Sequence, residues 1–393
     1  MKRVIITLLN CLIFTFFITA CSNEDVPVQE NDSNDTSPAR FLETDGVFVL
    51  NNGCSYQGDD GTLTYIDYTE DHYSNLDIYK QVNGKSLGGG PNDIIVYGEK
   101  VYIVGADENT IFILHVRTRK ELKQVSTTDL LGDAEGRTPR RIAAYDGKVY
   151  FTTDGGYVAS IDTTNFALHR KYQVGPYIEG LAFGDSGTLY VANSDWGYGN
   201  GSIYKIDLKT SNVTEIKNDK VTYPRDIVVA GDVLYVLDWG YYDDDWTQQL
   251  DAGVYMISSN DAKLVVPNAT GMTVIGNMLY TYNDPLGGSG ATYSTYDIPS
   301  NHLSTLSLSG DANHKLISPS AISVDPITGN IYIASRRFGS DTSYFFNYPD
   351  PSSDIPGFVN VYSNSGQFIE SYHTGIEPRK IAFYHELHKV QPY

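Results

Sequence analysis

The sequence predicts an all-β protein, a seven-bladed β-propeller with four-stranded antiparallel blades. Three observations lead to this fold. A short apolar strand centred on Tyr or Phe recurs seven times, its aromatic positions lie 40 to 54 residues apart, and each copy has the same kind of neighbouring segments. This period is typical of propeller blades and exceeds the roughly 20 to 30 residues of solenoid repeats.

The repeated strand is expected to be the second strand of each blade. Its copies are Val47–Val49, Val101–Ile103, Val149–Phe151, Leu189–Val191, Leu234–Val236, Leu279–Thr281 and Ile331–Ile333. An apolar strand precedes most copies, for example residues 93–96, and a tight Gly turn joins the two. An alternating hairpin such as residues 202–216 follows. Four strands therefore make each blade, numbered A to D from the axis outward. The alternative is a sandwich of seven unrelated hairpins, against which the regular period argues.

The two ends of the chain carry complementary parts of one blade. The first copy begins directly with its second strand, residues 47–50, whereas residues 378–383 resemble an inner strand with nothing after it. We therefore expect the N- and C-terminal strands to pair and close the ring, because closure removes the open strand edges that favour aggregation.

The first twenty residues have the pattern of an export signal. Lys2 and Arg3 precede an apolar stretch from residue 4 to residue 17, and Ile18-Thr19-Ala20-Cys21 follows. This order indicates a signal peptide over residues 1–20 rather than a membrane span. The final four residues resemble a bacterial lipobox, in which the cysteine becomes the acylated first residue of the mature protein. An ordinary signal peptide with a chance cysteine is the alternative, but Cys21 stands at the cleavage position itself.

Residues 21–40 are polar and acidic, so we expect a flexible tether, followed by the propeller over residues 41–393. Glu24 and Asp25 lie directly behind Cys21 and resemble the surface-export signal of gut-type Gram-negative lipoproteins. The expected location is therefore the outer membrane, lipid-anchored and facing the cell exterior.

The composition restricts the partners. Without Lys2 and Arg3 the chain keeps 26 basic against 48 acidic side chains, a formal charge near −22. Nucleic acid and anionic membrane surfaces are poor partners for such a charge, so we expect membrane contact through the lipid anchor alone. Cys54 is the one cysteine left after Cys11 and Cys21, which excludes a disulfide framework. No catalytic, metal-binding or cofactor motif is present, and we predict a protein that is not an enzyme.

Propeller topology assigns the loops to two faces. The B–C loops emerge on the same face as the connections between blades, and four of them are long: residues 193–201, 238–253, 283–290 and 335–357. The aromatic residues of these loops that we predict to contact a ligand are Trp196, Tyr198, Trp239, Tyr241, Tyr242, Trp246, Phe338, Tyr344 and Phe345. Aromatic side chains offer a large contact area with little rotamer entropy to lose, which favours recognition. The alternative for any single ring is packing onto its own loop.

Basic residues accompany this face. Arg140 and Arg225 follow prolines at the starts of inner strands, as do Arg379 and Lys380, while Arg336 lies at the start of the last long loop. Guanidinium groups in such positions can hold a phosphate or amide oxygens, so we add Arg140, Arg225, Arg336 and Arg379 to the predicted ligand contacts. The alternative is a network of salt bridges between blades.

Taken together, these features resemble a known group of proteins. The lipobox with its acidic continuation, the segment Gly46–Gly53 leading to Gly61–Tyr65, and seven YncE-like blades are similar to the surface vitamin B12 capture lipoproteins of gut bacteria, the BtuG type. The resemblance implies non-covalent binding of cobalamin or a related corrinoid on the loop-rich face, and transfer to a TonB-dependent outer-membrane transporter. A corrinoid is large, rimmed with amides and carries a phosphodiester, so a wide face of rings, hydroxyls and arginines suits it.

Two other functions remain open at this point. In a metal-dependent lactonase-like propeller, Glu179, Asn193 and Asp238 would supply oxygen ligands at the channel mouth. A glycan- or protein-binding scaffold is the other alternative, because Trp and Tyr platforms also stack on sugar faces.

Overall fold

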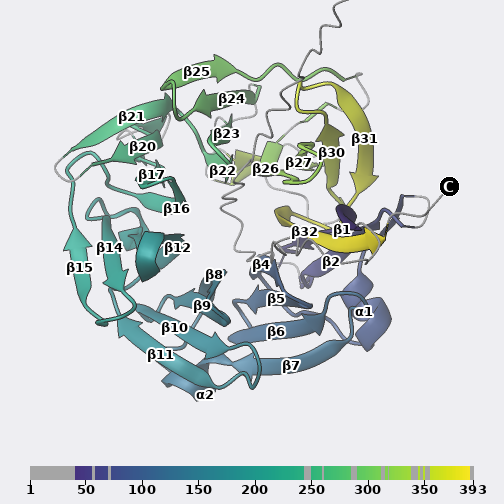
Figure 1. The fold of residues 1–393 in the computed structure, drawn as a ribbon, viewed down its shortest axis with the longest axis horizontal. Coiled ribbons are helices and arrows are strands. Elements are labelled where there is room, and N and C mark those ends of the chain that lie inside the picture. The colour runs from purple at the N-terminus through teal and green to yellow at the C-terminus, as the bar shows by residue number, and fades with distance from the viewer. Residues whose placement is uncertain are drawn as a thin grey trace, which may run out of the picture.

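Seven sheets form a closed ring around a central axis (Figure 1). A computed structural model describes residues 40–54, 58–69, 72–242, 249–258, 261–284, 290–310, 315–316, 318–337, 344–345, 348–349 and 355–389. Each of the seven sheets has four antiparallel strands, so the predicted seven-bladed β-propeller is confirmed. The predicted signal peptide, Cys21 and the acidic tether up to residue 39 lie outside the described residues.

Six blades are built from consecutive segments and run from strand A at the axis to strand D outside. Blades 2 and 3 comprise β4 (Pro91–Tyr97), β5 (Lys100–Gly105), β6 (Thr110–His115), β7 (Glu121–Ser126), β8 (Pro139–Tyr145), β9 (Lys148–Thr153), β10 (Tyr157–Asp162) and β11 (Leu168–Gln173). Blades 4 and 5 comprise β12 (Ile178–Gly184), β13 (Thr188–Asn193), β14 (Ser202–Asp207), β15 (Val213–Ile216), β16 (Pro224–Ala230), β17 (Val233–Asp238), β20 (Gly253–Ile257) and β21 (Ala262–Pro267). Blades 6 and 7 comprise β22 (Gly271–Ile275), β23 (Met278–Asn283), β24 (Thr292–Asp297), β25 (His302–Thr305), β26 (Ser318–Val324), β27 (Ile331–Arg336), β30 (Phe358–Tyr362) and β31 (Phe368–His373).

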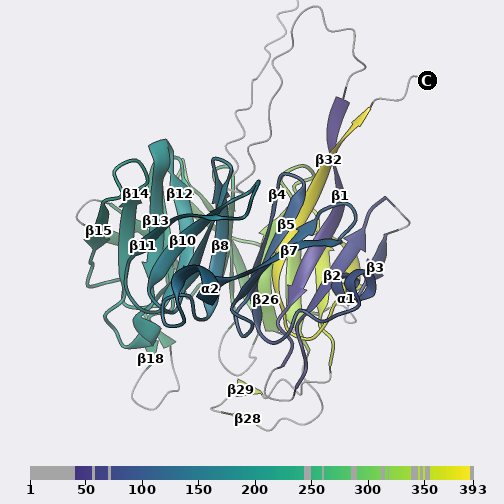
Figure 2. The same cartoon turned by 90° about the horizontal axis from the view of Figure 1, so that it is seen from below.

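Blade 1 combines both ends of the described chain. Its strands are β32 (Pro378–Lys389), β1 (Arg40–Asn51), β2 (Thr62–Asp67) and β3 (Tyr73–Asn75), in that order from the axis. The pairing of β1 with β32 confirms the predicted closure of the ring. It also continues past the blade, from Thr44 opposite His385 to Arg40 opposite Lys389, as a two-stranded ribbon that projects from one face (Figure 2).

The repeated apolar strand is explained by burial on both of its faces. In β5, Val101 and Ile103 belong to the hydrophobic core shared with blade 1. Tyr102 and Val104 point the other way and belong to the core shared with blade 3. Successive side chains of a strand alternate between its two faces, so a strand placed between two cores needs an unbroken apolar run. This is why strand B carries the clearest repeat in the sequence.

Glycine allows neighbouring blades to approach closely. A Cβ atom on Gly357, just before β30, would lie 2.6 Å from the Cδ atom of Pro378, the first residue of strand A in the next blade. Gly201 and Pro224 have the same relation between blades 4 and 5. The prolines at the starts of inner strands therefore pack against positions where a side chain does not fit.

The long B–C loops lie on the face opposite the ribbon (Figure 2). They include two small hairpins, β18 (Tyr241–Tyr242) with β19 (Gln249–Leu250) and β28 (Tyr344–Phe345) with β29 (Tyr348–Pro349). The helices α1 (Ile78–Asn83) and α2 (Thr127–Leu131) follow blades 1 and 2. We call the side with the hairpins the loop face.

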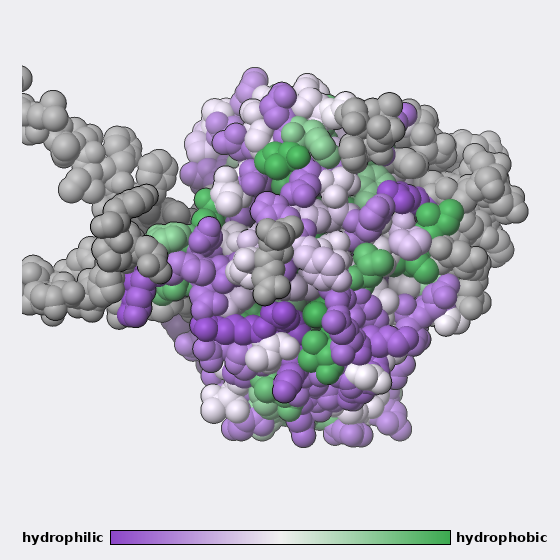
Figure 3. Space-filling model, turned by 90° about the vertical axis from the view of Figure 1, so that its right-hand side faces the viewer, coloured by the Kyte–Doolittle hydropathy of each residue, from purple (hydrophilic) through white to green (hydrophobic). Residues whose placement is uncertain are grey.

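The outer surface is mainly hydrophilic. From the side shown in Figure 3, hydrophobic residues are scattered among polar ones, as on ordinary water-exposed surfaces. Within the described part of the chain, no helix has the length and apolar character needed to cross a membrane.

Candidate functional site

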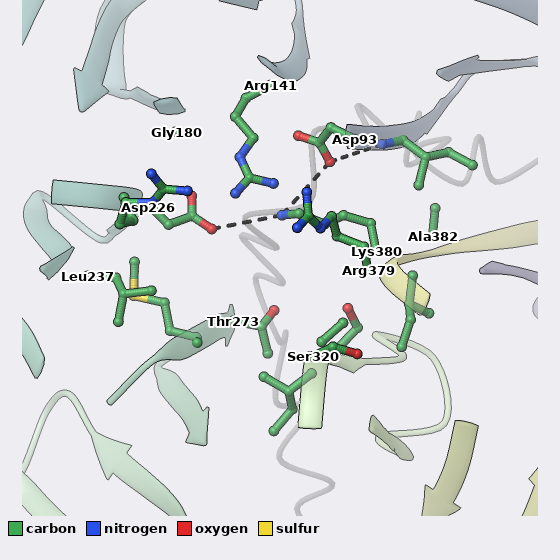
Figure 4. A pocket seen from close by; sticks show the side chains of 18 of the residues that line it. Asp93, Arg141, Gly180, Asp226, Leu237, Thr273, Ser320, Arg379, Lys380 and Ala382 are labelled. Carbon is green, nitrogen blue, oxygen red and sulfur yellow. Dashed lines mark hydrogen bonds and ion pairs between the residues drawn. The ribbon is translucent and has the colours of Figure 1, made fainter. Parts of the chain in front are cut away.

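A cavity of about 620 Å³ lies on the propeller axis. Strand A, or the residue just before it, contributes lining side chains in all seven blades. Many of the lining groups are charged, and Figure 4 shows Arg141 and Arg379 directed from different sides toward the centre of the channel. The axis of the ring is therefore a polar well.

A buried carboxylate organises one side of the mouth. Arg140 Nη2 donates a hydrogen bond to Glu179 Oε1 at 2.7 Å, and Arg225 Nη1 lies 3.0 Å from the same oxygen. Arg141 Nε lies 3.8 Å from Glu179 Oε2. Burial alone would raise the pKa of Glu179, but Arg225, Arg140 and Arg141 lower it to about 2. This carboxylate is therefore ionised at neutral pH, and one negative charge faces three positive ones.

β-Bulges explain why these side chains turn toward the axis. In six blades the register between strand A and strand B shifts at the start of strand A. A bulge leaves residues without a partner in the ladder and redirects their side chains. The residues released in this way are Asn92, Arg140, Arg141, Glu179, Gly180, Arg225, Ser320 and Arg379. The bulges thus place most of the charged groups of the mouth.

Arg379 differs from the other arginines of the mouth. Its Nη1 donates to Asn92 Oδ1 at 3.0 Å, and among the described residues it forms no salt bridge within 4.0 Å. Its side chain is exposed to the open channel, so water reaches it although protein surrounds the channel. Desolvation by the surrounding protein lowers the pKa of Arg379 to about 10; Glu377 opposes this shift, whereas Arg141 and Arg140 add to it. Arg379 therefore keeps its charge at neutral pH and carries it without a close counter-ion.

A second group of charges lies at blades 6 and 7. Arg336 Nη2 lies 3.3 Å from Asp284 Oδ2, and its Nη1 lies 3.5 Å from Glu377 Oε1. Ser318 Oγ also donates to Asp284 Oδ2 at 2.7 Å. Two carboxylates therefore compensate Arg336, which makes this side of the mouth more negative than the side around Glu179.

Deeper in the channel, Lys380 connects opposite blades. Its Nζ lies 3.8 Å from Asp93 and 3.8 Å from Asp226, as the dashed lines in Figure 4 show. Burial would lower the pKa of Arg141, but Asp93, Asp226 and Glu179 raise it, so this guanidinium stays charged. Lys380, Asp93, Asp226 and Arg141 therefore form a network of charges across the channel.

Aromatic rings border the cationic side. The guanidinium carbon of Arg225 lies 4.5 Å from the ring centre of Trp239 and 5.3 Å from that of Tyr223. Trp239 Nε1 donates to the backbone oxygen of Thr270 at 3.1 Å, which fixes the indole ring at the mouth. Cation–π contacts of this kind stabilise a charged guanidinium group over the face of an aromatic ring. The mouth therefore combines a fixed aromatic ring with several guanidinium groups.

The structure brings together five of the predicted contact residues. The central cavity is lined by Trp239, Arg140, Arg225, Arg336 and Arg379. The alternative of salt bridges between blades also holds, because Arg140, Arg225 and Arg336 each pair with a carboxylate.

Three predicted aromatic contacts lie elsewhere. Trp196 is 50% exposed and packs on Tyr177, with 5.4 Å between ring centres, and neither it nor the exposed Tyr198 lines the central cavity. Tyr241 lines a separate cavity of about 440 Å³ with Tyr255. These three rings belong to the B–C loops, as expected, but lie away from the central cavity, and their contact with a ligand stays a prediction.

The remaining aromatic predictions stay untested. Trp246 and Phe338 lie outside the described residues. Tyr242, Tyr344 and Phe345 belong to described strands, but their side chains are not described.

Sequence reasoning missed the residues that precede the inner strands. Thr138, Tyr177 and Glu377 each stand directly before strand A and have positive φ angles of 48°, 61° and 54°. Residues other than glycine rarely adopt this backbone conformation, and it is enriched at functional sites. The conformation recurs at one position of three blades, and of these residues Glu377 lines the central cavity. All three residues directly precede strand A of their blade, and an alignment of the repeats at that position could have identified them.

The proposed oxygen ligands of a lactonase have other partners. The carboxylate of Asp238 accepts hydrogen bonds from the backbone nitrogens of Tyr223 at 2.9 Å and Gly240 at 2.7 Å. Asn193 Oδ1 accepts from the backbone of its own loop, and Glu179 pairs with arginines. In the part of the chain that is described, no group of three His, Cys, Asp or Glu residues is placed to hold a metal ion.

The comparisons with known proteins give one partial family match and a set of structures with a similar fold. Residues 45–237 match the family model described as "Domain of unknown function (DUF5074)", and no curated protein matches the sequence. A quinonprotein alcohol dehydrogenase-like protein from Bacteroides thetaiotaomicron VPI-5482 is similar at 16% identity and a TM-score of 0.56, over 88% of this chain and 85% of that one. Hydrazine synthase of Kuenenia stuttgartiensis is similar at 14% identity and a TM-score of 0.53, over 73% and 88% of the two chains. At these identities the likeness shows the fold alone. The chain is a seven-bladed β-propeller, and its residues 45–237 are similar to the DUF5074 family model.

Proposed function

We propose that this propeller is a lipid-anchored surface protein that binds cobalamin or a related corrinoid without catalysis. It then passes the ligand to a TonB-dependent outer-membrane transporter. The observation that carries the proposal is the mouth of the central cavity, where the fixed ring of Trp239 borders a group of arginines.

The chemistry of this mouth suits a corrinoid. A corrinoid offers a broad apolar ring system, peripheral amides and one phosphodiester. Trp239 offers an aromatic surface, and Arg225, held against it, offers guanidinium donors for amide or phosphate oxygens. The cavity of about 620 Å³ lies within the range of roughly 300–1,000 Å³ that is common for small-molecule sites. A corrinoid would therefore cover the mouth and insert only part of its periphery.

The direction of the chain indicates how a protein anchored through Cys21 would be oriented relative to the membrane. β1 begins at Arg40 on the ribbon, which projects on the side opposite the loop face (Figure 2). Cys21 precedes Arg40 by only 19 positions in the sequence. A protein anchored through Cys21 would therefore stand close to the membrane on its ribbon side and direct the loop face outward.

A calorimetric titration with cyanocobalamin tests this proposal. We expect saturable binding to the wild-type protein and binding at least about thirtyfold weaker, a loss of about 2 kcal/mol, for Trp239→Ala. Trp196→Ala is the matched control, because Trp196 lies outside the central cavity and its loss should change the affinity much less. The absence of binding by any corrinoid would refute the proposal.

A further inference from the structure

We infer that the channel mouth contains a binding site for a phosphate-type oxyanion, formed by Arg379 together with Arg140 and Arg141. The inference rests on the proposed function, because that function places a ligand at this mouth. It does not depend on the ligand being a corrinoid, because the shared chemistry is that of a tetrahedral phosphate group.

The local charge is the first argument. The chain is strongly acidic, with a formal net charge of −20, yet Arg140, Arg141 and Arg225 share the single carboxylate of Glu179. Three other carboxylates are near: Asp154 lies 3.7 Å from Arg140 Nε, while Asp93 and Asp226 act on Arg141 and each lie 3.8 Å from Lys380 Nζ. Burial raises the pKa of Asp154 to about 6, although Arg140 opposes this, so its charge is weakly favoured. A positive excess therefore remains on this side of the mouth.

Unused hydrogen-bond donors are the second argument. Among the described residues, the Nε atoms of Arg140, Arg141, Arg225 and Arg336 are buried and have no hydrogen-bond partner. A buried polar group without a partner costs about 1–3 kcal/mol, so such groups are usually satisfied in native proteins. The exposed Arg379 uses only Nη1 in its hydrogen bonds with described residues, so its other donors are open to an acceptor at the mouth, whereas the buried Nε atoms need a small shift of their guanidinium groups to reach one.

The direction of the guanidinium groups is the third argument. Arg379 comes from blade 1, and Arg140 and Arg141 come from blade 3, so the donors approach the axis from different sides (Figure 4). A tetrahedral phosphate presents oxygens in several directions, whereas a planar carboxylate presents two oxygens in one plane. The arrangement therefore favours a phosphate group over a carboxylate.

The backbone holds these donors in place before any ligand binds. Arg379 and Arg140 lie at bulges directly after the prolines that start their inner strands, and Arg141 belongs to the same bulge as Arg140. Asn92 holds the Arg379 guanidinium through a hydrogen bond of 3.0 Å. Donors fixed in this way lose little conformational freedom on binding, which favours affinity.

Titration of the detergent-solubilised full-length protein with inorganic phosphate tests the site. The binding can be followed by calorimetry and by the ³¹P NMR signal at low ionic strength. We expect Arg379→Gln to weaken phosphate binding at least about tenfold and Arg379→Lys to weaken it less, because the charge remains. Arg117→Gln is the matched control, since Arg117 is 56% exposed and pairs with Glu386 outside the channel.

Glu179→Gln provides a test with the opposite sign. Removing this carboxylate leaves three guanidinium groups without their shared counter-ion, so phosphate should bind more tightly by about tenfold. A merely structural role of Glu179 would weaken phosphate binding instead. Unchanged circular dichroism of each variant shows that the comparison is made on folded protein.

Titrations with other ligands identify the source of the phosphate group. If dimethyl phosphate binds with the same affinity as inorganic phosphate, the site accepts the phosphodiester of a larger ligand. If inorganic phosphate binds more tightly, the site accepts the free anion. Both results support the site. Acetate binding equally well would overturn the preference for a phosphate group. If cyanocobalamin binds but no phosphate species does, the oxyanion site is wrong and the proposed function stands. If phosphate binds through Arg379 and no corrinoid binds, the reverse is true.

Discussion

The shared carboxylate of the mouth allows a quantitative prediction. Replacing Glu179 by Gln keeps the shape of the side chain and removes the charge that Arg140, Arg141 and Arg225 share. The difference between the ordinary pKa of 4.5 and the pKa of about 2 in the folded protein corresponds to about 3 kcal/mol of stability. Glu179 is 2% exposed, so solvent screens this interaction little.

The sign of the pH dependence follows from the lowered pKa. A carboxylate with a lower pKa in the folded state contributes its stability above pH 4.5 and loses it as the pH falls toward 2. We therefore expect Glu179→Gln to cost about 3 kcal/mol at pH 7 and about half of that at pH 3.

Urea unfolding measured at pH 7, 4.5 and 3 provides the assay. The difference in the free energy of unfolding between wild type and Glu179→Gln should shrink with decreasing pH. Glu215→Gln serves as the control, because the Glu215 side chain is 40% exposed and pairs with Lys217 at 3.8 Å on the surface. A Glu179→Gln variant whose stability differs from wild type by the same amount at all three pH values would refute the electrostatic account.

Three further predictions concern the ring and the anchor. Truncation before Pro378 should cause aggregation or a melting temperature far below that of the full chain, because β1 then loses its ladder partner β32; an unchanged melting curve would contradict the closure model. Cys21→Ala should abolish lipid labelling and release the protein from membranes into the soluble fraction. Replacing Glu24 and Asp25 by neutral residues should leave the protein anchored but inaccessible to protease added to intact cells, whereas the wild-type protein should be digested.

The fold was predictable because its strongest determinant is local. Strand B of each blade lies between two hydrophobic cores, and Tyr102 and Ile103 show how adjacent residues serve different cores. Such a strand is recognisable without knowledge of its partners. The closure of the ring was also predictable, because residues 47–50 and residues 378–383 each lacked the strand that the other supplied.

The site was predictable only in part. The prolines before Arg140, Arg225 and Arg379 correctly indicated the mouth of the channel. The bulges that turn neighbouring residues such as Arg140 and Arg141 toward the axis depend on the register between strands, which the sequence does not show. Loop geometry likewise decides that Trp239 reaches the cavity and Trp196 does not.

A structure of the protein with cyanocobalamin would test the central claim most directly. The account predicts the corrinoid on the loop face, over the mouth of the central cavity, with its ring system or base in contact with Trp239. Its phosphodiester or amide oxygens should lie within hydrogen-bonding distance of the guanidinium groups at the mouth. A corrinoid bound on the ribbon face or the outer rim, or none at saturating concentration, would contradict it.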